Sequence, residues 1–315
     1  MPHPGPGQVL VKVHAVALNR RDAAIRDLSY PVGDVDRFVP GSDAAGEIIG
    51  LGEAVSGWKI GDRVASTFFQ EWHSGGITLP ALRSSLGAGG QGVFADHILL
   101  AEHGIVRAPS GWSYAEAACL PCAGVTAWSA LMTLGGLQQG DWVLIVGTGG
   151  VALFALQIAV AAGARVAILS SSDEKLARAK ALGAQVGINY RTTPEWSEVV
   201  RDATGGGVQH ALELGGAGTL QRTIDSLALG GHVALIGALA GFGGALPTAV
   251  MTMKGLRASA VLVGSRASQI ALTDFMVDRG IRPVIDSCYG FEQAEEAYRR
   301  VSAGAFGKVV VSFAD

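Results

Sequence analysis

The chain has 315 residues, of which 49% are hydrophobic, and a formal net charge of −3. This length suggests two domains, with enough core to fold without disulfide staples. No block of Lys and Arg marks a nucleic-acid surface. Three cysteines are too few for a disulfide framework, so we expect a reduced, cytoplasmic setting. Residues 1–7 lack the basic segment and apolar run of a signal peptide.

The first part of the chain is punctuated closely by Gly and Pro. Short strands are predicted at residues 9–13, 46–50 and 61–65, which favours a small, β-rich, barrel-like unit. The Gly- and Ser-rich residues 70–92 are predicted to form a loop. Residues 94–106 are expected to form a further pair of strands.

From about residue 141 the pattern changes to strands that alternate with helices. The predicted strands cover residues 142–146, 165–169, 186–189, 210–214, 232–236 and 258–263. The predicted helices cover residues 151–162, 173–182, 194–204 and 219–227. This alternation predicts an α/β domain with a doubly wound parallel sheet. Helices at 268–279 and 291–302 and a strand at 308–313 then return to the first domain.

Residues 142–164 carry no charge and are long enough to span a bilayer. However, the glycine-rich residues 147–150 interrupt this segment, its first part is rich in β-branched residues, and its second part is helical in character. We therefore predict a buried strand, a turn and a buried helix, and no membrane partner.

The turn Gly147-Thr148-Gly149-Gly150-Val151-Ala152 is the first candidate binding site. Its glycines permit a tight turn and close approach of a pyrophosphate, and the helix that follows offers free N–H groups at its start. An ordinary tight turn is the alternative. The four strand–helix units that follow favour a dinucleotide.

The end of the second strand indicates which dinucleotide binds. NAD enzymes carry Asp or Glu there, for the ribose 2′-hydroxyl. This chain has Ser170-Ser171-Ser172, with Lys175 a turn later and Tyr190 at the end of the third strand. Hydroxyls and a cation suit a 2′-phosphate, so NADP is predicted over NAD. The alternative is that Ser171 and Glu174 form a helix capping box and Lys175 is a solvated side chain.

Several motifs, in this order, resemble the medium-chain dehydrogenase/reductase superfamily over nearly the whole chain. They are Val16-Ala17-Leu18-Asn19-Arg20-Arg21-Asp22, Pro40-Gly41-Ser42-Asp43-Ala44-Ala45-Gly46, Gly61-Asp62-Arg63-Val64, Leu120-Pro121-Cys122-Ala123-Gly124-Val125-Thr126-Ala127-Trp128, the glycine turn, and Phe306-Gly307-Lys308-Val309-Val310. The resemblance implies a GroES-like substrate domain (1–123 and 264–315) and a Rossmann domain (124–263). It also implies a homodimer formed through the edge strand at 258–263.

The sequence departs from the zinc alcohol dehydrogenases of that superfamily. Their catalytic zinc is held by a Cys, a His in a Gly-His-Glu motif, and a second Cys. Here Asn19 and Ser42 stand at the first two positions, and Cys122 alone remains. Catalytic zinc needs about three protein ligands, so no zinc is expected. The cysteines of the structural zinc loop are also absent, and His73, His97 and His103 do not show metal-ligand spacing.

This zinc-free pattern resembles the quinone oxidoreductase branch and its alcohol-dehydrogenase-like relatives. The resemblance implies that Ser170, Lys175 and Tyr190 bind the 2′-phosphate. It further implies that Thr126 contacts the nicotinamide, that Arg20 approaches the pyrophosphate, and that Arg266 closes over the phosphates. The backbone that would line the ring and ribose belongs to Leu214, Gly215, Gly237, Ala238, Leu239, Val263 and Gly264. Members also begin with a β-hairpin before the segment equivalent to residues 6–11. Either the start of this sequence is truncated or an edge of the first domain is missing.

Hydride transfer to a quinone or an enone places negative charge on an oxygen, which needs a hydrogen-bond donor. Asn19 is the candidate donor because it stands where the first zinc ligand would be, although a structural role in a turn is the alternative. Arg21 replaces the proton-relay hydroxyl of the alcohol dehydrogenases. The sequence predicts an NADPH-dependent quinone or α,β-unsaturated carbonyl reductase. A zinc-free alcohol or aldehyde oxidoreductase and a non-catalytic NADPH-binding protein are the alternatives.

Overall fold

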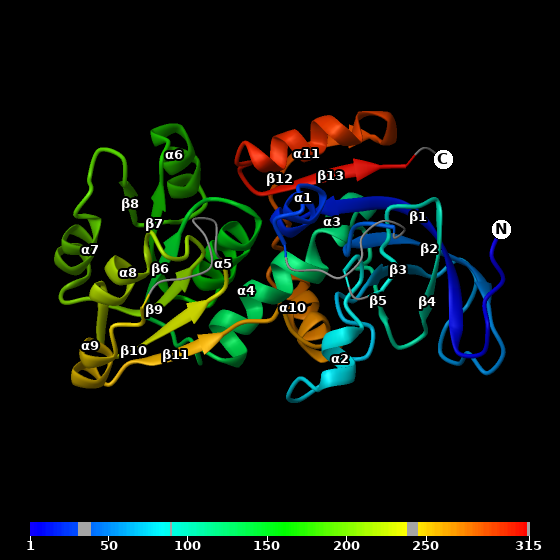
Figure 1. Ribbon diagram of the computed structural model, residues 1–315, viewed down its shortest axis with the longest axis horizontal. Helices are drawn as coiled ribbons and strands as arrows, with labels where there is room; N and C mark the ends of the chain where they lie inside the picture. Colours follow the sequence, from blue (N-terminus) through cyan, green and yellow to red (C-terminus); the bar gives the residue numbers. More distant parts are fainter. Residues whose placement is uncertain (31–38, 89, 238–244, 314–315) are drawn as a thin grey trace. The chain divides into compact units, whose positions relative to one another are not determined.

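The structure is a computed structural model that describes residues 1–30, 39–88, 90–237 and 245–313 (Figure 1). The chain divides into two compact units. Unit 1 consists of Met1–Val125 and Val263–Asp315, and unit 2 consists of Thr126–Leu262.

Unit 1 is built around a largely antiparallel sheet of seven strands (Figure 1). The strand order is β12-β13-β1-β2-β3-β5, and β4 pairs with the first part of β1, from Gln8 to Lys12. The strands are β1 (Gln8–Leu18), β2 (Ala44–Leu51), β3 (Arg63–Ser66), β4 (His97–Ala101), β5 (Ile105–Arg107), β12 (Ile285–Gly290) and β13 (Lys308–Ser312). The long strand β1 therefore pairs with three neighbours, β13, β2 and β4, and is the central strand of the unit.

The apolar side chains of β1 close this sheet around a core. Val9, Val11, Val13 and Val16 are all buried, and they pack with Ile48 and other apolar residues of neighbouring strands. The spacing of two residues places Val9, Val11 and Val13 on one face of the strand. Val16 joins the same core beyond the register shift between Val13 and Ala15. The strands β4 and β5 do not pair with each other, contrary to the expectation of a strand pair, since β4 pairs with β1 and β5 with β3.

Short helices flank the sheet of unit 1. They are α1 (Arg20–Arg26), α2 (Leu79–Arg83), α3 (Tyr114–Ala118), α10 (Arg266–Asp278) and α11 (Ala294–Ser302). A π-helical turn, Leu120–Gly124, leads into α4 (Val125–Trp128), where unit 2 begins, and a second one, Ser129–Thr133, follows. The sequence predicted residues 70–92 to be a loop, but the helix α2 lies within them. It forms because Thr78 caps it and Pro80 suits a first helical turn.

Unit 2 has a six-stranded parallel sheet with the order β11-β10-β9-β6-β7-β8, which is the doubly wound order predicted for a Rossmann domain. Its strands are β6 (Trp142–Val146), β7 (Arg165–Ser170), β8 (Val186–Asn189), β9 (Val208–Glu213), β10 (Leu227–Leu235) and β11 (Arg257–Ala260). Its longer helices are α5 (Gly150–Ala161), α6 (Asp173–Ala181), α7 (Trp196–Thr204), α8 (Leu220–Asp225) and α9 (Thr248–Lys254).

The segment that resembled a membrane span is the centre of unit 2. All five residues of β6 are buried, as is typical of a parallel strand covered on both faces. The helix α5 is apolar around most of its circumference and buries seven of its residues. Among the described residues, no helix is both long and apolar enough to cross a membrane.

Some predicted boundaries were wrong. The helix predicted at 219–227 ends at Asp225, and Leu227 already begins β10 and is buried in the core. The helix predicted at 291–302 begins with a 3-10 turn, Phe291–Gln293, before α11. In both cases the apolar residue at the boundary suits either structure, and tertiary packing decides which one forms.

Candidate cofactor and catalytic sites

The glycine turn lies at the switch point of the parallel sheet, where β6 lies between β7 and β9. Gly147 follows β6 with a φ of 112°, a conformation that favours glycine. Gly149 caps α5 without any side-chain hydrogen bond. A Cβ at either glycine would meet no atom within 4 Å. The turn is therefore an open cradle at an uncapped helix N-terminus, which suits a pyrophosphate.

The residues predicted to bind a 2′-phosphate gather at the ends of two neighbouring strands. Ser170 ends β7 opposite Asn189 of β8, and its carbonyl oxygen accepts from the N–H of Tyr190 at 3.1 Å. The N-cap of α6 is Ser172, whose Oγ accepts from the N–H of Lys175 at 3.3 Å. The alternative capping role of Ser171 was therefore wrong.

Three groups in this region suit an anionic ligand. Tyr190 has 42% of its surface exposed, Lys175 is partly exposed on the first turn of α6, and Ser171 precedes the cap. The region contains hydroxyls and a cation next to a helix N-terminus, and the residue that ends β7 is not acidic. These groups fit a 2′-phosphate.

Glu213 organises the next loop of unit 2 and was not singled out from the sequence. It ends β9 and is 1% exposed. One oxygen of its carboxylate accepts from the N–H groups of Gly215 and Gly216, at 2.7 and 2.9 Å, and from the Thr219 hydroxyl at 2.6 Å. The other oxygen accepts a short hydrogen bond from Thr223.

A second loop is attached to the same residue. The Glu213 carbonyl accepts from the N–H of Gly237 at 3.1 Å, and a Cβ at Gly237 would lie 2.4 Å from the carbonyl oxygen of Leu214. Glu213 thus fixes Leu214, Gly215 and Gly237, three of the residues predicted to line the ring and ribose. Ala238 and Leu239, predicted for the same role, lie outside the described residues.

The remaining predicted cofactor residues have defined places within their own units. Thr126 is buried on α4 of unit 2. In unit 1, Arg20 donates to the carbonyl oxygen of Ser302 at 3.0 Å, and the Arg266 side chain donates to that of Ile105 at 3.0 Å. Val263, with a φ of 57°, precedes Gly264 and the N-cap of α10.

The positions that correspond to zinc ligands belong to a polar cluster in unit 1, of which Ser42, Asp43 and Lys308 are buried and Asn19 and Cys122 are partly buried. We call it the Lys308 cluster; its members are Asn19, Ser42, Asp43, Cys122 and Lys308. The ammonium of Lys308 lies 2.6 Å from Oδ1 of Asn19 and 3.6 Å from Oδ2 of Asp43. Asp43 also accepts from the Ser42 hydroxyl at 2.6 Å and from the N–H of Cys122 at 3.1 Å. Lys308 and Asp43 are 2% and 0% exposed, so the ion pair is fully buried.

The Lys308 cluster does not provide the donors that a catalytic zinc requires. Cys122 is its only soft ligand, and burial, together with the Asp43 carboxylate, raises the pKa of this thiol well above its ordinary value. Asn19 and Ser42 stand where the other two ligands would be, and catalytic zinc needs about three protein ligands. The amine of Lys308 already supplies a positive charge beside Asp43. Lys308 therefore places a positive charge of the protein itself at these positions.

Asp22 lies beside the Lys308 cluster, on α1. It is 2% exposed, and its Oδ2 accepts from the N–H of Asn19 at 2.7 Å, whereas its Oδ1 has no hydrogen-bond partner among the described residues. Burial raises the pKa of the Asp22 carboxyl from 3.8 to about 6; the Asp43 charge adds to this, and Arg21 opposes it.

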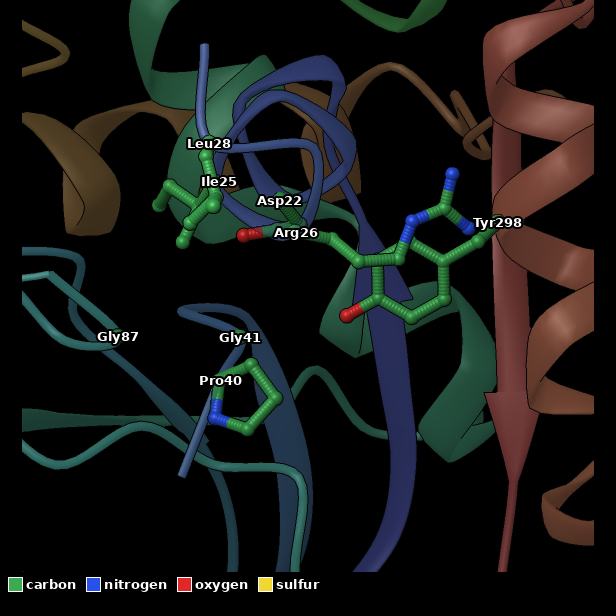
Figure 2. Close-up of a pocket in the computed structure, with 8 residues that line it drawn as sticks. All are labelled: Asp22, Ile25, Arg26, Leu28, Pro40, Gly41, Gly87 and Tyr298. Carbon is green, nitrogen blue, oxygen red and sulfur yellow. The ribbon is translucent and has the colours of Figure 1, made fainter. Parts of the chain in front are cut away.

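A pocket of about 330 Å³ adjoins this carboxyl (Figure 2). Its described lining residues are Asp22, Ile25, Arg26, Leu28, Pro40, Gly41, Gly87 and Tyr298.

Arg21, at the position of a proton-relay hydroxyl, instead donates to the carbonyl oxygen of Leu86 at 2.6 Å and lies over the ring of Phe68.

Comparison with known proteins gives the same two-part organisation. Residues 5–110 match the family model of the alcohol dehydrogenase GroES-like domain, and residues 150–278 match that of a zinc-binding dehydrogenase. A zinc-type alcohol dehydrogenase-like protein of Schizosaccharomyces pombe is 41% identical over 97% of this chain and 91% of its own length. Human quinone oxidoreductase is 28% identical over 99% and 91%.

Solved structures agree with these matches. One from Sinorhizobium meliloti, whose description as an alcohol dehydrogenase is provisional, is 40% identical, with a TM-score of 0.93 over 99% of this chain and 93% of its own. An NAD-dependent alcohol dehydrogenase is 31% identical (TM-score 0.89; 99% and 93%). A mycobacterial protein complexed with NADPH is 25% identical (TM-score 0.83; 99% and 93%).

The fold, the glycine turn and these matches define an oxidoreductase with a Rossmann domain and a GroES-like domain. The chain belongs to the medium-chain dehydrogenase/reductase superfamily.

The raised pKa of Asp22 predicts a pH-dependent effect of Asp22→Asn on stability. Since the folded-state pKa of about 6 exceeds the ordinary 3.8, ionisation of Asp22 opposes folding. This penalty grows between about pH 4 and pH 6 and is complete above pH 6, where it is on the order of 2–3 kcal/mol. Urea unfolding should therefore show Asp22→Asn to be more favourable for stability at pH 8 than at pH 4.5, by about 1–3 kcal/mol.

The exposed neighbour Asp27 provides the matched control. Asp27→Asn should change the free energy of unfolding by the same small amount at both pH values, because its carboxylate is half exposed. An Asp22→Asn effect on the free energy of unfolding that does not differ between the two pH values would contradict the raised pKa of Asp22.

Proposed function

We propose that this protein is a zinc-independent, NADPH-dependent oxidoreductase that transfers hydride to a quinone or an α,β-unsaturated carbonyl compound. The observation that carries the proposal is the Lys308 cluster, where an ammonium at 2.6 Å from Asn19 and 3.6 Å from Asp43 stands in place of a metal ligand set. This arrangement favours acceptors whose reduction needs a hydrogen-bond donor rather than a Lewis acid.

The preference for NADPH is supported by the end of β7. Ser171, Lys175 and Tyr190 offer hydroxyls and a cation there, whereas a carboxylate would repel a 2′-phosphate. Ser170, which was also predicted to bind this phosphate, is 3% exposed, and its Oγ accepts from the N–H of Ser172 at 3.3 Å. When bound, the reduced nicotinamide supplies the hydride. The glycine turn would hold the pyrophosphate, and Glu213 would keep the Leu214 and Gly237 loops in place beside the ring.

Asn19 is the proposed donor to the oxygen that becomes negative. Its Oδ1 accepts from the Lys308 ammonium at 2.6 Å, which polarises the amide and makes its N–H groups stronger donors. Its Nδ2 lies 3.5 Å from the Ser42 hydroxyl. Since an amide nitrogen carries two N–H groups, one remains for a substrate oxygen. Lys308 is then a positioning residue, and Asp43 compensates its charge.

A zinc-free alcohol or aldehyde oxidoreductase is the second candidate, because the fission yeast relative and two of the solved structures carry alcohol dehydrogenase descriptions. Lys308 would also assist there by stabilising an alkoxide through Asn19.

A homodimer is proposed for both candidates. Its contact would be β11, an edge strand of the unit 2 sheet whose residues are largely exposed.

Acceptor selectivity tests the function. NADPH oxidation should be fastest with quinones and enones, slower with aldehydes, and unchanged after incubation with a strong chelator and its removal. Faster turnover of aldehydes would favour the second candidate. Loss of turnover on chelation, with recovery on adding zinc, would contradict zinc independence. If NADPH binds but no acceptor in the panel is reduced, both enzymatic readings fail.

Lys175→Ala tests the choice of cofactor. Because Lys175 would contact only the 2′-phosphate, its removal should weaken NADPH binding at least tenfold, or about 1.4 kcal/mol, and leave NADH binding within about twofold. Fluorescence titration measures both dissociation constants. Lys180→Ala, on the same helix but farther from its N-terminus, is the control and should change neither. Equal weakening of NADPH and NADH by Lys175→Ala would reject the 2′-phosphate assignment.

A further inference from the structure

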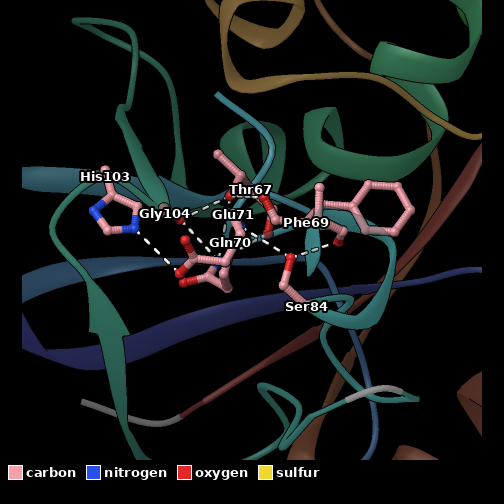
Figure 3. Close-up of polar contacts among 8 residues, drawn as sticks. Thr67, Phe69, Gln70, Glu71, Ser84, His103 and Gly104 are labelled. Atoms are coloured by element: carbon pink, nitrogen blue, oxygen red, sulfur yellow. Dashed lines mark hydrogen bonds and ion pairs between the residues drawn. The ribbon is translucent and has the colours of Figure 1, made fainter. Parts of the chain in front are cut away.

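Unit 1 brings together three side chains that the sequence does not connect. Glu71 and His73 follow β3, and His103 lies in the turn between β4 and β5. One potential ligand atom from each lies within 4.8 Å of those of the other two. Nε2 of His103 is 3.3 Å from Oε1 of Glu71 (Figure 3), and the two imidazole rings are 4.6 Å apart, edge to face. His73 and His103, which do not show metal-ligand spacing in the sequence, thus lie together in the fold.

The backbone on the Glu71 side of this group is fixed before any ligand binds. The N–H of Glu71 donates to the Ser84 hydroxyl at 2.9 Å (Figure 3). The carbonyl oxygen of His73 accepts from the N–H of Ala267 at 3.0 Å, at the start of α10. The segment is thus held at both ends, and only the side chains have to move.

The turn that carries His103 is fixed as well. The amide of Gln70 donates to the carbonyl oxygen of Gly104 at 2.9 Å, and the Thr67 hydroxyl donates to the same oxygen at 3.1 Å (Figure 3). A Cβ at Gly104 would lie 2.1 Å from the Gln70 amide oxygen, so glycine permits this close approach. Gln70 therefore ties the His103 turn to the residue that precedes Glu71.

We propose that Glu71, His73 and His103 bind one Zn²⁺ ion, with water completing its coordination. Two imidazoles and a carboxylate are donors that suit Zn²⁺ better than Mg²⁺ or Ca²⁺, which prefer oxygen. Around a tetrahedral ion at 2.0–2.1 Å, ligand atoms lie about 3.4 Å apart. The present separations, all within 4.8 Å, need only small side-chain rotations, and the His103 and Glu71 side chains are 43% and 50% exposed.

This site is separate in chemistry and in role from the Lys308 cluster. It would link the segment at 71–73 to the turn at 102–104 and so stabilise unit 1, because an ion that binds only the folded state raises stability. It takes no part in hydride transfer. Bound zinc and zinc-independent catalysis are therefore compatible in this chain.

Titration of chelator-stripped full-length protein with ZnCl₂, followed by calorimetry, tests the proposal. The wild type should bind one Zn²⁺ per chain and gain thermal stability. His103→Ala and His73→Ala should each weaken binding at least tenfold and abolish the gain, while NADPH binding and circular dichroism stay unchanged. His3→Ala, which removes an exposed histidine elsewhere in unit 1, is the control and should behave as the wild type.

Wild-type zinc affinity in both cluster variants would overturn the proposal, as would the absence of measurable binding to the wild type. Zinc binding that survives His103→Ala but is lost in Cys122→Ser would also overturn it, and would place the metal at the Lys308 cluster. Failure of the surface site leaves the acceptor and chelation result untouched, so the two proposals are tested separately.

Discussion

The buried ion pair between Lys308 and Asp43 is the constraint on which unit 1 depends. Lys308 begins β13, which pairs with β1, and Asp43 immediately precedes β2, which pairs with the other edge of β1. A buried charge that loses its partner costs several kcal/mol, so these elements must meet in one register. Asn19, the N-cap of α1, accepts a further hydrogen bond from the Lys308 ammonium through its Oδ1. The same contacts that order the unit thus place the proposed oxyanion donor.

Unit 2 uses a carboxylate in a comparable way. Glu213 accepts four hydrogen bonds at the end of β9, and these shape the loop beside the switch point of the sheet. The glycine turn follows the neighbouring strand β6, with space over Gly147 and Gly149. Each unit therefore uses buried charge to fix backbone where a ligand is proposed to bind. The ligand itself needs to order little of the protein.

The sequence was sufficient to predict the parallel sheet, the glycine turn and the family, because periodicity and motif spacing are local signals. It was not sufficient to find the Lys308 cluster, although a lysine before the apolar run at 309–311 was a visible anomaly. Its partners Asn19 and Asp43 are more than 250 residues away, and only strand pairing joins them. Glu71, His73 and His103 were missed for the same reason. Ser171 was considered as the N-cap of α6, whereas Ser172 is the cap in the structure. Two adjacent serines suit an N-cap equally well, so the sequence alone does not decide between them.

The central claim is that Lys308 and Asp43 act as one buried pair in place of a metal site, and a double-mutant cycle tests it most directly. Lys308→Met and Asp43→Asn should each lower the free energy of unfolding by about 3–5 kcal/mol, since each leaves an unpaired buried charge. The double variant should lose clearly less than the sum of the two, with a coupling of at least about 1 kcal/mol. Additive losses, with no coupling between the two positions, would contradict the account.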